Sequence, residues 1–221
     1  MRQSLLPVLA VALALGSGVG VACGADEPGG SPAAGAGDGS RAGTDNPTVR
    51  PELAGTADTV LVMGDSLVNG ARLFGDLGDR LDAAGFDTLE IVAEDGRDPA
   101  WGVEQIEDMA EVPEVVVIEL GTNPDADPDG FAEVAASLVS ALRARGAERI
   151  AWLTPVHGRD DRYDDKVAIL ASTPGLDQVA DWASVVRDDP RRLAADGLHP
   201  TREGYSELAD FLVDTAASLA G

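Results

Sequence analysis

The stretch TVLVMGDSL at positions 59–67 decides the fold, because a short β-branched and apolar run ends in a glycine and then in a serine that opens a helical pattern. Runs that are apolar on both faces are typical of strands buried in a parallel sheet. Four more such runs follow along the chain: Thr88–Val92, Val115–Leu120, Arg149–Leu153 and, more weakly, Gln178–Ala180. The sequence therefore predicts about five buried strands.

Apolar residues with helical spacing separate these runs. The predicted helices cover Leu67–Ala84, Trp101–Met109, Phe131–Leu142 and Tyr205–Leu219, and Gly85 and Gly146 mark two helix C-termini. Strand–helix alternation predicts an α/β fold, a three-layer α/β/α sandwich around a mainly parallel sheet of about five strands. Ligands of such sheets lie at the carboxyl ends of the strands, so functional residues should converge there.

The N-terminal part of the chain has a different composition. Residues 1–22 combine one cation, a short apolar stretch and small residues ahead of Cys23, which is the layout of a secretory signal peptide. The segment Val-Ala-Cys-Gly that contains Cys23 resembles the lipobox of bacterial lipoproteins, although Gly20 stands where leucine is usual. An ordinary cleaved signal is the alternative. Residues 23–57, rich in Gly, Ala, Pro and Asp, predict a lipidated cysteine followed by a flexible tether, and residues 58–221 predict one globular domain.

The charge of the chain limits its partners. A formal net charge of −23 would repel nucleic acid and anionic membrane surfaces, so we expect no nucleic-acid partner. Contact with a membrane is expected only through a lipid anchor at Cys23, on an exported protein held at the outer face of the cell membrane. Cys23 is the only cysteine, which excludes a disulfide within the chain. The sequence does not indicate an oligomeric state.

Ser66 is a candidate nucleophile. It lies directly after the first predicted strand and opens the first predicted helix, whose N-terminus would favour negative charge developing on a reaction intermediate. The alternative is a serine that only caps the helix. Val68 stands where the Gly-x-Ser-x-Gly elbow of α/β-hydrolases has its second glycine, so that type of elbow is not indicated.

Asp196 and His199 are candidates for activating this serine. A serine is a weak nucleophile until a neighbouring base accepts its proton, and histidine has a suitable pKa for that role. Asp196 precedes His199 by three residues, so in a tight turn its carboxylate could hold the imidazole in one tautomer. A capping aspartate beside a surface histidine is the alternative, and the presence of Ser66 favours the catalytic interpretation.

Two further residues are candidates for stabilising an oxyanion. Gly96 follows the second predicted strand, where a glycine backbone can approach a substrate closely. Asn123 follows the third predicted strand and could donate from its side-chain amide. Pro124 favours an extended backbone at Asn123, which would fix the direction of that amide. Either residue could instead be an ordinary turn residue.

Four segments stand in order along residues 58–221: Gly64-Asp65-Ser66-Leu67, a loop glycine, Gly121-Thr122-Asn123 and Asp196-x-x-His199-Pro200. Together they resemble the four blocks of the SGNH (GDSL-type) hydrolase superfamily. The resemblance implies an SGNH/flavodoxin-like fold, with Ser66 as nucleophile, His199 as base and Asp196 as its orienting partner. It also implies an oxyanion hole from the backbone amides of Ser66 and Gly96 and the side chain of Asn123. Pro124 departs from the aspartate that usually follows in this family, which affects the expected shape of the substrate pocket.

A narrower likeness concerns the substrate. Gly96-Arg97 and Asp181-Trp182 are similar to SGNH domains associated with O-acyltransferases of bacterial envelope polysaccharides. Arg97 and Asp65 are the candidate substrate-binding residues, and for Arg97 a solvated loop arginine is the alternative. Trp101 and Trp182 are better explained by packing than by stacking on sugars. His157, after the fourth predicted strand, could line the same edge of the sheet, but a surface loop histidine is the favoured interpretation.

The sequence thus predicts a serine esterase that cleaves a small acyl ester, such as an acetyl group on a carbohydrate, and needs no cofactor. The aspartates at 125, 127 and 129 lack the glycine and distal glutamate of a calcium-binding hand, so no metal site is expected. One alternative keeps the triad and transfers the acyl group to a sugar hydroxyl instead of water. Another is a non-catalytic envelope-binding module on the same fold.

Overall fold

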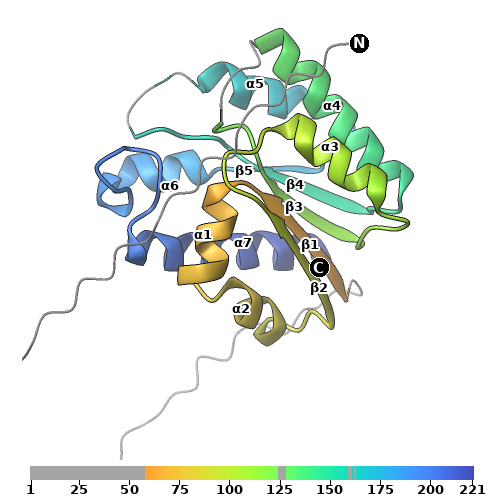
Figure 1. Cartoon of the computed structure of the whole chain (residues 1–221), viewed down its shortest axis with the longest axis horizontal. Helices are drawn as coiled ribbons and strands as arrows, with labels where there is room; N and C mark the ends of the chain where they lie inside the picture. The colour runs from red at the N-terminus through yellow and green to blue at the C-terminus, as the bar shows by residue number, and fades with distance from the viewer. Residues whose placement is uncertain (1–57, 124–127, 159–160, 162) are drawn as a thin grey trace, which may run out of the picture. The chain divides into compact units, whose positions relative to one another are not determined.

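The computed structural model describes residues 58–123, 128–158, 161 and 163–221, in which strands and helices alternate (Figure 1). The elements, in chain order, are β1 (Thr59–Gly64), α1 (Ser66–Phe74), α2 (Leu77–Ala83), β2 (Thr88–Ala93), α3 (Pro99–Asp108), β3 (Val115–Glu119), α4 (Pro128–Ala144), β4 (Arg149–Leu153), α5 (Asp164–Ser172), β5 (Gln178–Ala180), α6 (Trp182–Asp188), the short 3₁₀ helix η1 (Pro190–Arg192) and α7 (Arg202–Ala220). The predicted signal peptide, Cys23 and tether lie outside the described residues.

The five strands form one parallel sheet in the order β2-β1-β3-β4-β5. The chain order reverses between β1 and β3, and crevices of α/β sheets open at such reversals, outside the carboxyl ends of the strands. Gly64 at the end of β1 is in register with Ala93 of β2 and Glu119 of β3. The segments that follow these residues are therefore brought together at the reversal.

Two hydrophobic cores cover the two faces of the sheet. Side chains alternate between the faces of a strand, so Val60 and Val62 of β1 pack with α1, α2, α6 and α7, whereas Leu61 and Met63 pack with α3, α4 and α5. Figure 1 shows the two helical layers on either side of the sheet. The predicted three-layer α/β/α architecture with a five-stranded parallel sheet is confirmed.

The helices differ from the prediction in three places. The single helix expected over 67–84 is interrupted after Phe74 at Gly75, which packs directly on α7: a Cβ at this position would lie 2.4 Å from the carbonyl oxygen of Tyr205, so only glycine fits. Asp76 then adopts a left-handed conformation with φ of 52° before α2 begins. The short helices α5 and α6 were not expected from the apolar spacing.

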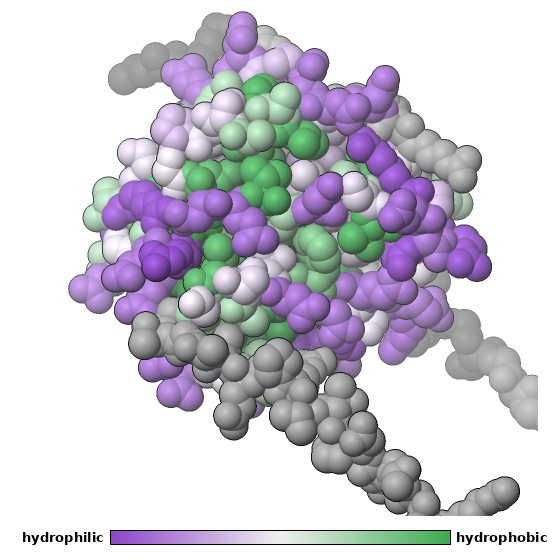
Figure 2. Space-filling view, turned by 180° about the vertical axis from the view of Figure 1, so that it is seen from behind, coloured by the Kyte–Doolittle hydropathy of each residue, from purple (hydrophilic) through white to green (hydrophobic). Residues whose placement is uncertain are grey.

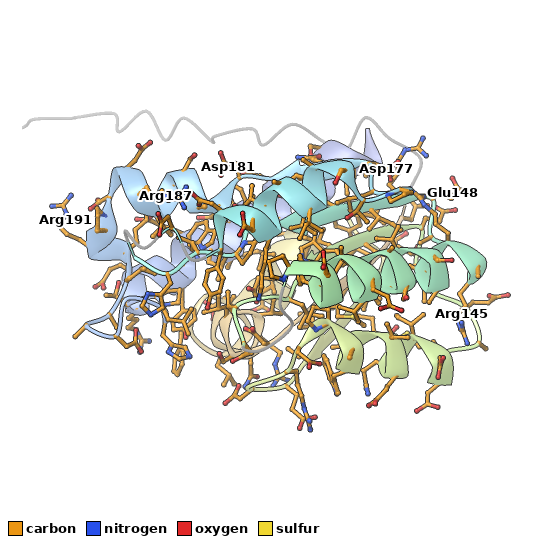
Figure 3. All side chains as sticks on the ribbon, turned by 90° about the horizontal axis from the view of Figure 1, so that it is seen from above. Arg145, Glu148, Asp177, Asp181, Arg187 and Arg191 are labelled. Atoms are coloured by element: carbon orange, nitrogen blue, oxygen red, sulfur yellow. The ribbon has the colours of Figure 1, made fainter. Side chains whose placement is uncertain are left out.

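The polarity of the sheet can be followed from charged residues near its ends. In Figure 3, Glu148 and Asp177, which directly precede β4 and β5, lie at one end, and Asp181, which follows β5, lies towards the other with Arg187. Figure 2 shows hydrophilic residues spread over the opposite face of the molecule from that in Figure 1, with hydrophobic residues visible between them. None of the described helices is long and apolar enough to span a membrane.

Candidate active site

Ser66 is placed by a tight connection between β1 and α1. A Cβ at Gly64 would lie 2.3 Å from Val68 Cγ2 and 2.8 Å from the carbonyl oxygen of Glu119, so only glycine fits between β1, α1 and β3. Asp65 then caps α1, its Oδ1 accepting from the backbone N–H of Leu67 at 2.9 Å. Ser66 is the first residue of α1 and is half-buried at the carboxyl end of the sheet.

The loop before α7 carries the other two predicted catalytic residues. Leu193 and Pro200 form an antiparallel bridge, and the N–H of Ala194 donates to the carbonyl of His199 at 2.7 Å. Gly197, with φ of 73°, makes the turn between these two sides. The loop is therefore closed by backbone hydrogen bonds, although it projects from the body of the domain.

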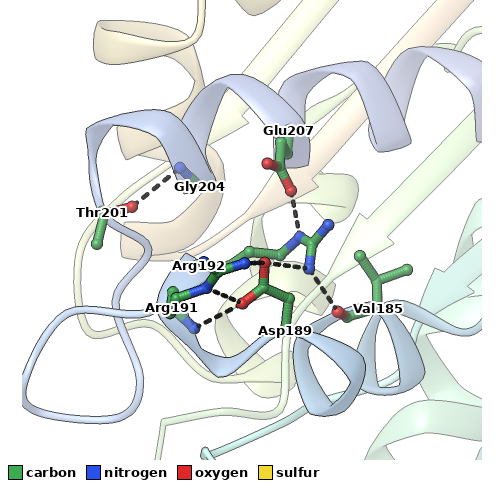
Figure 4. A network of polar contacts seen from close by, with 7 residues as sticks. All are labelled: Val185, Asp189, Arg191, Arg192, Thr201, Gly204 and Glu207. Atoms are coloured by element: carbon green, nitrogen blue, oxygen red, sulfur yellow. Dashed lines mark hydrogen bonds and ion pairs between the residues drawn. The ribbon is translucent and has the colours of Figure 1, made fainter.

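This closed loop is attached to α6 and α7 by a polar network (Figure 4). The backbone N–H of Thr201 donates to the carbonyl of Arg192 at 2.7 Å, and the Thr201 hydroxyl caps α7 at the N–H of Gly204. A Cβ at Gly204 would lie 2.1 Å from the Arg192 carbonyl oxygen, so glycine permits this close approach. The Arg192 guanidinium forms an ion pair with Glu207 and donates to the carbonyl of Val185. These contacts fix both ends of the loop.

The structure brings Ser66, His199 and Asp196 into one hydrogen-bonded chain. Ser66 Oγ lies 3.0 Å from His199 Nε2, and His199 Nδ1 lies 2.8 Å from Asp196 Oδ2. Asp196 Oδ1 accepts from the backbone N–H groups of Leu198 and His199 at 2.9 and 3.0 Å. The Leu198 N–H and then the His199 side chain lower the pKa of Asp196 to about 2, so this carboxylate is anionic at neutral pH. An anion at Nδ1 favours the tautomer in which Nε2 can accept the serine proton.

Asn123 is held by two hydrogen bonds from its amide nitrogen. Nδ2 donates to Asp65 Oδ2 at 2.6 Å and to the carbonyl of Arg97 at 3.1 Å. Because a side-chain amide has two hydrogens, both are engaged in this structure. Gly96 lies in the same loop with φ of 77° and open space around its Cα. Asn123 therefore ties the Gly96–Arg97 segment to the β1–α1 turn, and its role as an oxyanion donor stays a prediction.

Asp65, a candidate for substrate contact in the sequence, is instead fully buried, with an exposed fraction of 0%. Its carboxylate accepts from the N–H of Leu67, the hydroxyl of Thr122 at 2.6 Å and the amide of Asn123. Burial raises the pKa of Asp65, and the hydrogen bonds oppose that shift. The side chain points inward, where it caps α1 and accepts from Thr122 and Asn123.

Glu119, at the end of β3, is a second buried carboxyl group that the sequence reasoning missed. Burial first, and then the neighbouring charge of Asp65, raise the pKa of Glu119 well above its ordinary value. A signal was present in the sequence, since one glutamate interrupts the otherwise apolar run Val115–Leu120.

The remaining candidates lie around the site. The Arg97 guanidinium is partly exposed, forms an ion pair with Glu94 and lies 5.9 Å from the centre of the Trp101 ring. Trp101 and Trp182 are both buried in the hydrophobic cores, as their packing interpretation predicts. His157 is half-buried and lies beside Gly197 of the catalytic loop.

A cavity of about 200 Å³ adjoins Asn123. It lies between α3, α4 and α5 and is lined by Asp98, Pro99, Ala100, Asn123, Gly130, Phe131, Val134 and Lys166. The Lys166 ammonium donates to the carbonyl of Gly121 at 2.9 Å. The sequence predicts no metal site at the aspartates 125, 127 and 129, and those at 125 and 127 lie outside the described residues. Within the described ranges, no group of three or more His, Cys, Asp or Glu side chains could hold a metal ion.

Comparison with known proteins identifies the fold. No protein-family model and no curated protein matches the chain. Among solved structures, the catalytic domain of peptidoglycan O-acetyltransferase A from Streptococcus pneumoniae shares 24% identity over 75% of this chain and 96% of its own, with a TM-score of 0.58. AlinE4, an SGNH-hydrolase family esterase, shares 22% over 74% and 97%, with a TM-score of 0.51. A two-domain esterase active on acetylated mannans shares 17% over 75% and 51%, with a TM-score of 0.55.

At these identities the likeness establishes the fold. The structural neighbours include SGNH hydrolases, among them AlinE4 and a putative SGNH hydrolase from Slackia heliotrinireducens. The parallel sheet of order 2-1-3-4-5 between two helical layers is SGNH-like. The resemblance predicted from the sequence blocks is thereby confirmed for the fold, and the hydrogen bond between Ser66 and His199 is consistent with a catalytic triad.

Proposed function

We propose that this protein is a serine esterase that cleaves a small acyl ester, such as an acetyl ester on a carbohydrate. The observation that carries the proposal is the continuous chain from Ser66 Oγ through the His199 imidazole to the Asp196 carboxylate, with hydrogen-bond distances of 3.0 and 2.8 Å. The chain lies at the β1–β3 reversal, where α/β sheets bind their ligands. The esterases among the structural neighbours support the same activity.

The triad would act in two steps. Ser66 Oγ attacks the ester carbonyl carbon while His199 Nε2 takes the serine proton, and the anionic Asp196 stabilises the imidazolium that forms. The tetrahedral intermediate then breaks its bond to the alcohol oxygen, which leaves with the proton from His199. Water, deprotonated by the same imidazole, attacks the acyl-serine and releases the acid.

The oxyanion would be held at the N-terminus of α1. The backbone amides of Ser66 and Gly96 and the side-chain amide of Asn123 are the proposed donors. The Asn123 hydrogen bond to the Arg97 carbonyl is the longer of its two, at 3.1 Å. The Asn123 amide would tilt so that this hydrogen leaves the Arg97 carbonyl and donates to the oxyanion, because catalytic hydrogen bonds of a resting site often become aligned only when the substrate is bound.

The cavity beside Asn123 supports a small acyl group. At about 200 Å³, with Ala100, Phe131 and Val134 on its walls, it can hold a short apolar chain next to Asn123. Arg97 is the proposed contact for the alcohol part of the substrate, since its partly exposed guanidinium can donate to hydroxyl or anionic groups. An acetylated carbohydrate combines these two requirements, and one structural neighbour is active on acetylated mannans.

A second candidate function is transfer of the acyl group to a sugar hydroxyl of the cell envelope. The observation that favours it is the fold likeness to the catalytic domain of a peptidoglycan O-acetyltransferase. The chemistry of the first step is the same, and only the nucleophile that releases the acyl group differs. A non-catalytic envelope-binding module is disfavoured, because such a role does not require an aligned Ser66–His199–Asp196 chain.

We further propose that the protein is exported and anchored through a lipid on Cys23. The apolar leader over residues 1–22 and the resemblance around Cys23 to a lipobox support this proposal. The low-complexity segment 24–57 would then hold the domain away from the membrane surface. Labelling of cells with a radioactive fatty acid tests it: the label should enter the wild-type chain and not the Cys23→Ser variant.

The esterase proposal is tested by a time course of p-nitrophenyl acetate cleavage. We expect sustained turnover by the wild type, loss of turnover in Ser66→Ala, and wild-type turnover in the control Ser172→Ala, whose exposed hydroxyl bonds only to its own helix. Full activity of Ser66→Ala would refute the proposal. One burst of product that turns into sustained release only when a sugar acceptor is added would identify the transferase.

A further inference from the structure

Two buried carboxyl groups lie directly beneath the proposed oxyanion site, and the mechanism above does not use them. Asp65 follows β1 and Glu119 ends β3, and the strand register places Glu119 beside Gly64, the residue before Asp65. The exposed fractions are 0% for Asp65 and 3% for Glu119. The two carboxyl groups are close enough to interact, and the charge of Asp65 adds to the burial that raises the pKa of Glu119. Two carboxylates in such a position cannot both be ionised at low cost, so the pair must hold a proton.

The donors around the pair indicate which group is ionised. Asp65 accepts from Leu67 N–H on one oxygen and from Thr122 and Asn123 on the other, which is the surrounding of a carboxylate. The Asp65 backbone N–H faces the Glu119 carboxyl group and opposes the rise in its pKa, which burial and the Asp65 charge cause. Its Oε2 is buried, and no protein group of the described residues donates to it. An oxygen in this position is satisfied when it carries the proton and donates to the neighbouring carboxylate.

We propose that Glu119 is a positioning residue of the esterase site. As a protonated acid it donates to Asp65 and holds that buried carboxylate in place, and the Asp65 carboxylate in turn orients Asn123 and the Gly96–Arg97 segment. The proposal rests on the proposed function for its catalytic consequence, whereas the position of the proton is independent of it. Glu119 touches neither substrate nor Ser66 and acts through Asp65. The order of contacts is Glu119, Asp65, Asn123 and the Arg97 carbonyl.

The titratable groups that face Asp65 and Glu119 are consistent with one negative charge shared by these two carboxyl groups, and not with two. The nearby titratable groups are His199, on the catalytic loop, and Tyr205, on α7. Burial raises the pKa of Asp65, and the charge of a protonated His199 opposes that shift. Burial, followed by the carboxylates around it, raises the pKa of Tyr205 to about 12, so this phenol stays neutral. A second charge on Glu119 would repel Asp65 without gaining a donor at Oε2.

The first test locates the proton without using activity. A protonated carboxylic acid has a carbonyl stretch at higher frequency than a carboxylate or an amide, so infrared spectra of the whole protein at neutral pH should show such a band. We expect the band in the wild type and in Glu133→Gln, which changes an exposed glutamate of α4, and its loss in Glu119→Gln. Absence of the band from the wild type, or its persistence in Glu119→Gln, would overturn the proposal.

The second test uses two substitutions of the same residue. Glutamine is neutral and keeps both an acceptor for Asp65 N–H and a donor for the Asp65 carboxylate, whereas leucine keeps neither. With p-nitrophenyl acetate we expect Glu119→Gln to retain the kcat of the wild type within about twofold. Glu119→Leu should lose about 10- to 100-fold in kcat with little change in KM, because a displaced Asn123 amide would stabilise the transition state less.

Folding is controlled by the circular dichroism spectrum and by labelling of Ser66 with a fluorophosphonate, which does not depend on turnover of an ester. Equal kcat of folded Glu119→Gln and Glu119→Leu would overturn the positioning role. If the wild type hydrolyses no ester, the proposed function fails, and the infrared band still decides where the proton lies.

Discussion

The contacts of Asp196 make the substitution Asp196→Asn a sharp test of the triad. Two backbone N–H groups, from Leu198 and His199, point at Asp196 Oδ1, so an asparagine must place its oxygen there and its NH₂ towards His199 Nδ1. Nδ1 must then accept a hydrogen bond, which moves the imidazole proton to Nε2. In that tautomer Nε2 faces Ser66 Oγ with a hydrogen and cannot take its proton.

The expected loss follows from the tautomer and from the exposure of the site. A substitution of this kind in a deeply buried triad costs about 10⁴-fold in kcat. Here the side chains of His199 and Asp196 are 41% and 51% exposed, so water screens the charge of the imidazolium and its attraction to the carboxylate is worth only about 1 kcal/mol. We therefore expect a fall of about 10²- to 10³-fold in kcat, or about 3–4 kcal/mol at 1.36 kcal/mol per decade.

The assay is the kcat for p-nitrophenyl acetate hydrolysis near neutral pH, with thermal unfolding as a control for folding. Asp189→Asn is the matched control, because the pKa of Asp189 is also lowered to about 2, by Arg191 first, and its carboxylate caps η1 without touching His199. We expect the control to keep the kcat of the wild type within about threefold. If Asp196→Asn kept more than about a tenth of the kcat, the tautomer argument would be refuted.

Three further predictions concern the elements that support the triad. Gly204→Ala would place a Cβ 2.1 Å from the Arg192 carbonyl oxygen, so it should lower the free energy of unfolding by about 1–3 kcal/mol and lower kcat. The control Gly78→Ala, in α2 with its nearest neighbour at 3.9 Å, should raise the melting temperature. Equal melting temperatures of the two variants would contradict the packing argument. Asn123→Ala should lower kcat about 10²-fold without a matching change in KM, and an unchanged kcat would remove Asn123 from the proposed oxyanion hole. The folded-state pKa of Asp196, at about 2, lies below its ordinary value of 3.8, so its contribution to stability should be present above pH 4 and be lost as the pH falls towards 2. In urea unfolding, the stability of Asp196→Asn should therefore depend less on pH in that window than the stability of the wild type does.

Much of the fold could be predicted because apolar runs and strand order determine it directly. The strands Arg149–Leu153 and Gln178–Ala180 have the predicted bounds, and the helix ends near Gly85 and Gly146 are marked by φ values of 100° and 106°. The interruption at Gly75 could not be predicted, since its cause is the Tyr205 carbonyl on a helix about 130 residues away in the sequence. The helices α5 and α6 are too short for apolar spacing to define them.

The candidate site likewise has one part that could be predicted from the sequence and one part that could not. Ser66, Asp196 and His199 could be proposed from residue type and order, because Ser66 directly follows β1 and Asp196 precedes His199 by three residues ahead of α7. The structure brings the three side chains into hydrogen-bond distance. The inward direction of Asp65 and the proton on Glu119 depend on which donors surround each oxygen, and those donors come from β1, β3 and the loop after β3. A single sequence does not contain that information.

The two halves of the site therefore depend on different parts of the structure. Ser66 and the proposed oxyanion donor Asn123 lie against buried carboxyl groups between β1 and β3, where we expect a changed side chain to affect folding and catalysis together. The base and its carboxylate lie on an exposed loop, where the hydrogen bonds of Arg192 and Thr201 hold them in place. Substitutions in that loop should change kcat at nearly constant stability, because few apolar contacts are lost there. Substitutions that remove the polar group of Glu119 or Thr122, such as Glu119→Leu, should lower both kcat and melting temperature. The correlation of kcat with melting temperature across the two sets would separate a site preformed in the core from one assembled by its loop.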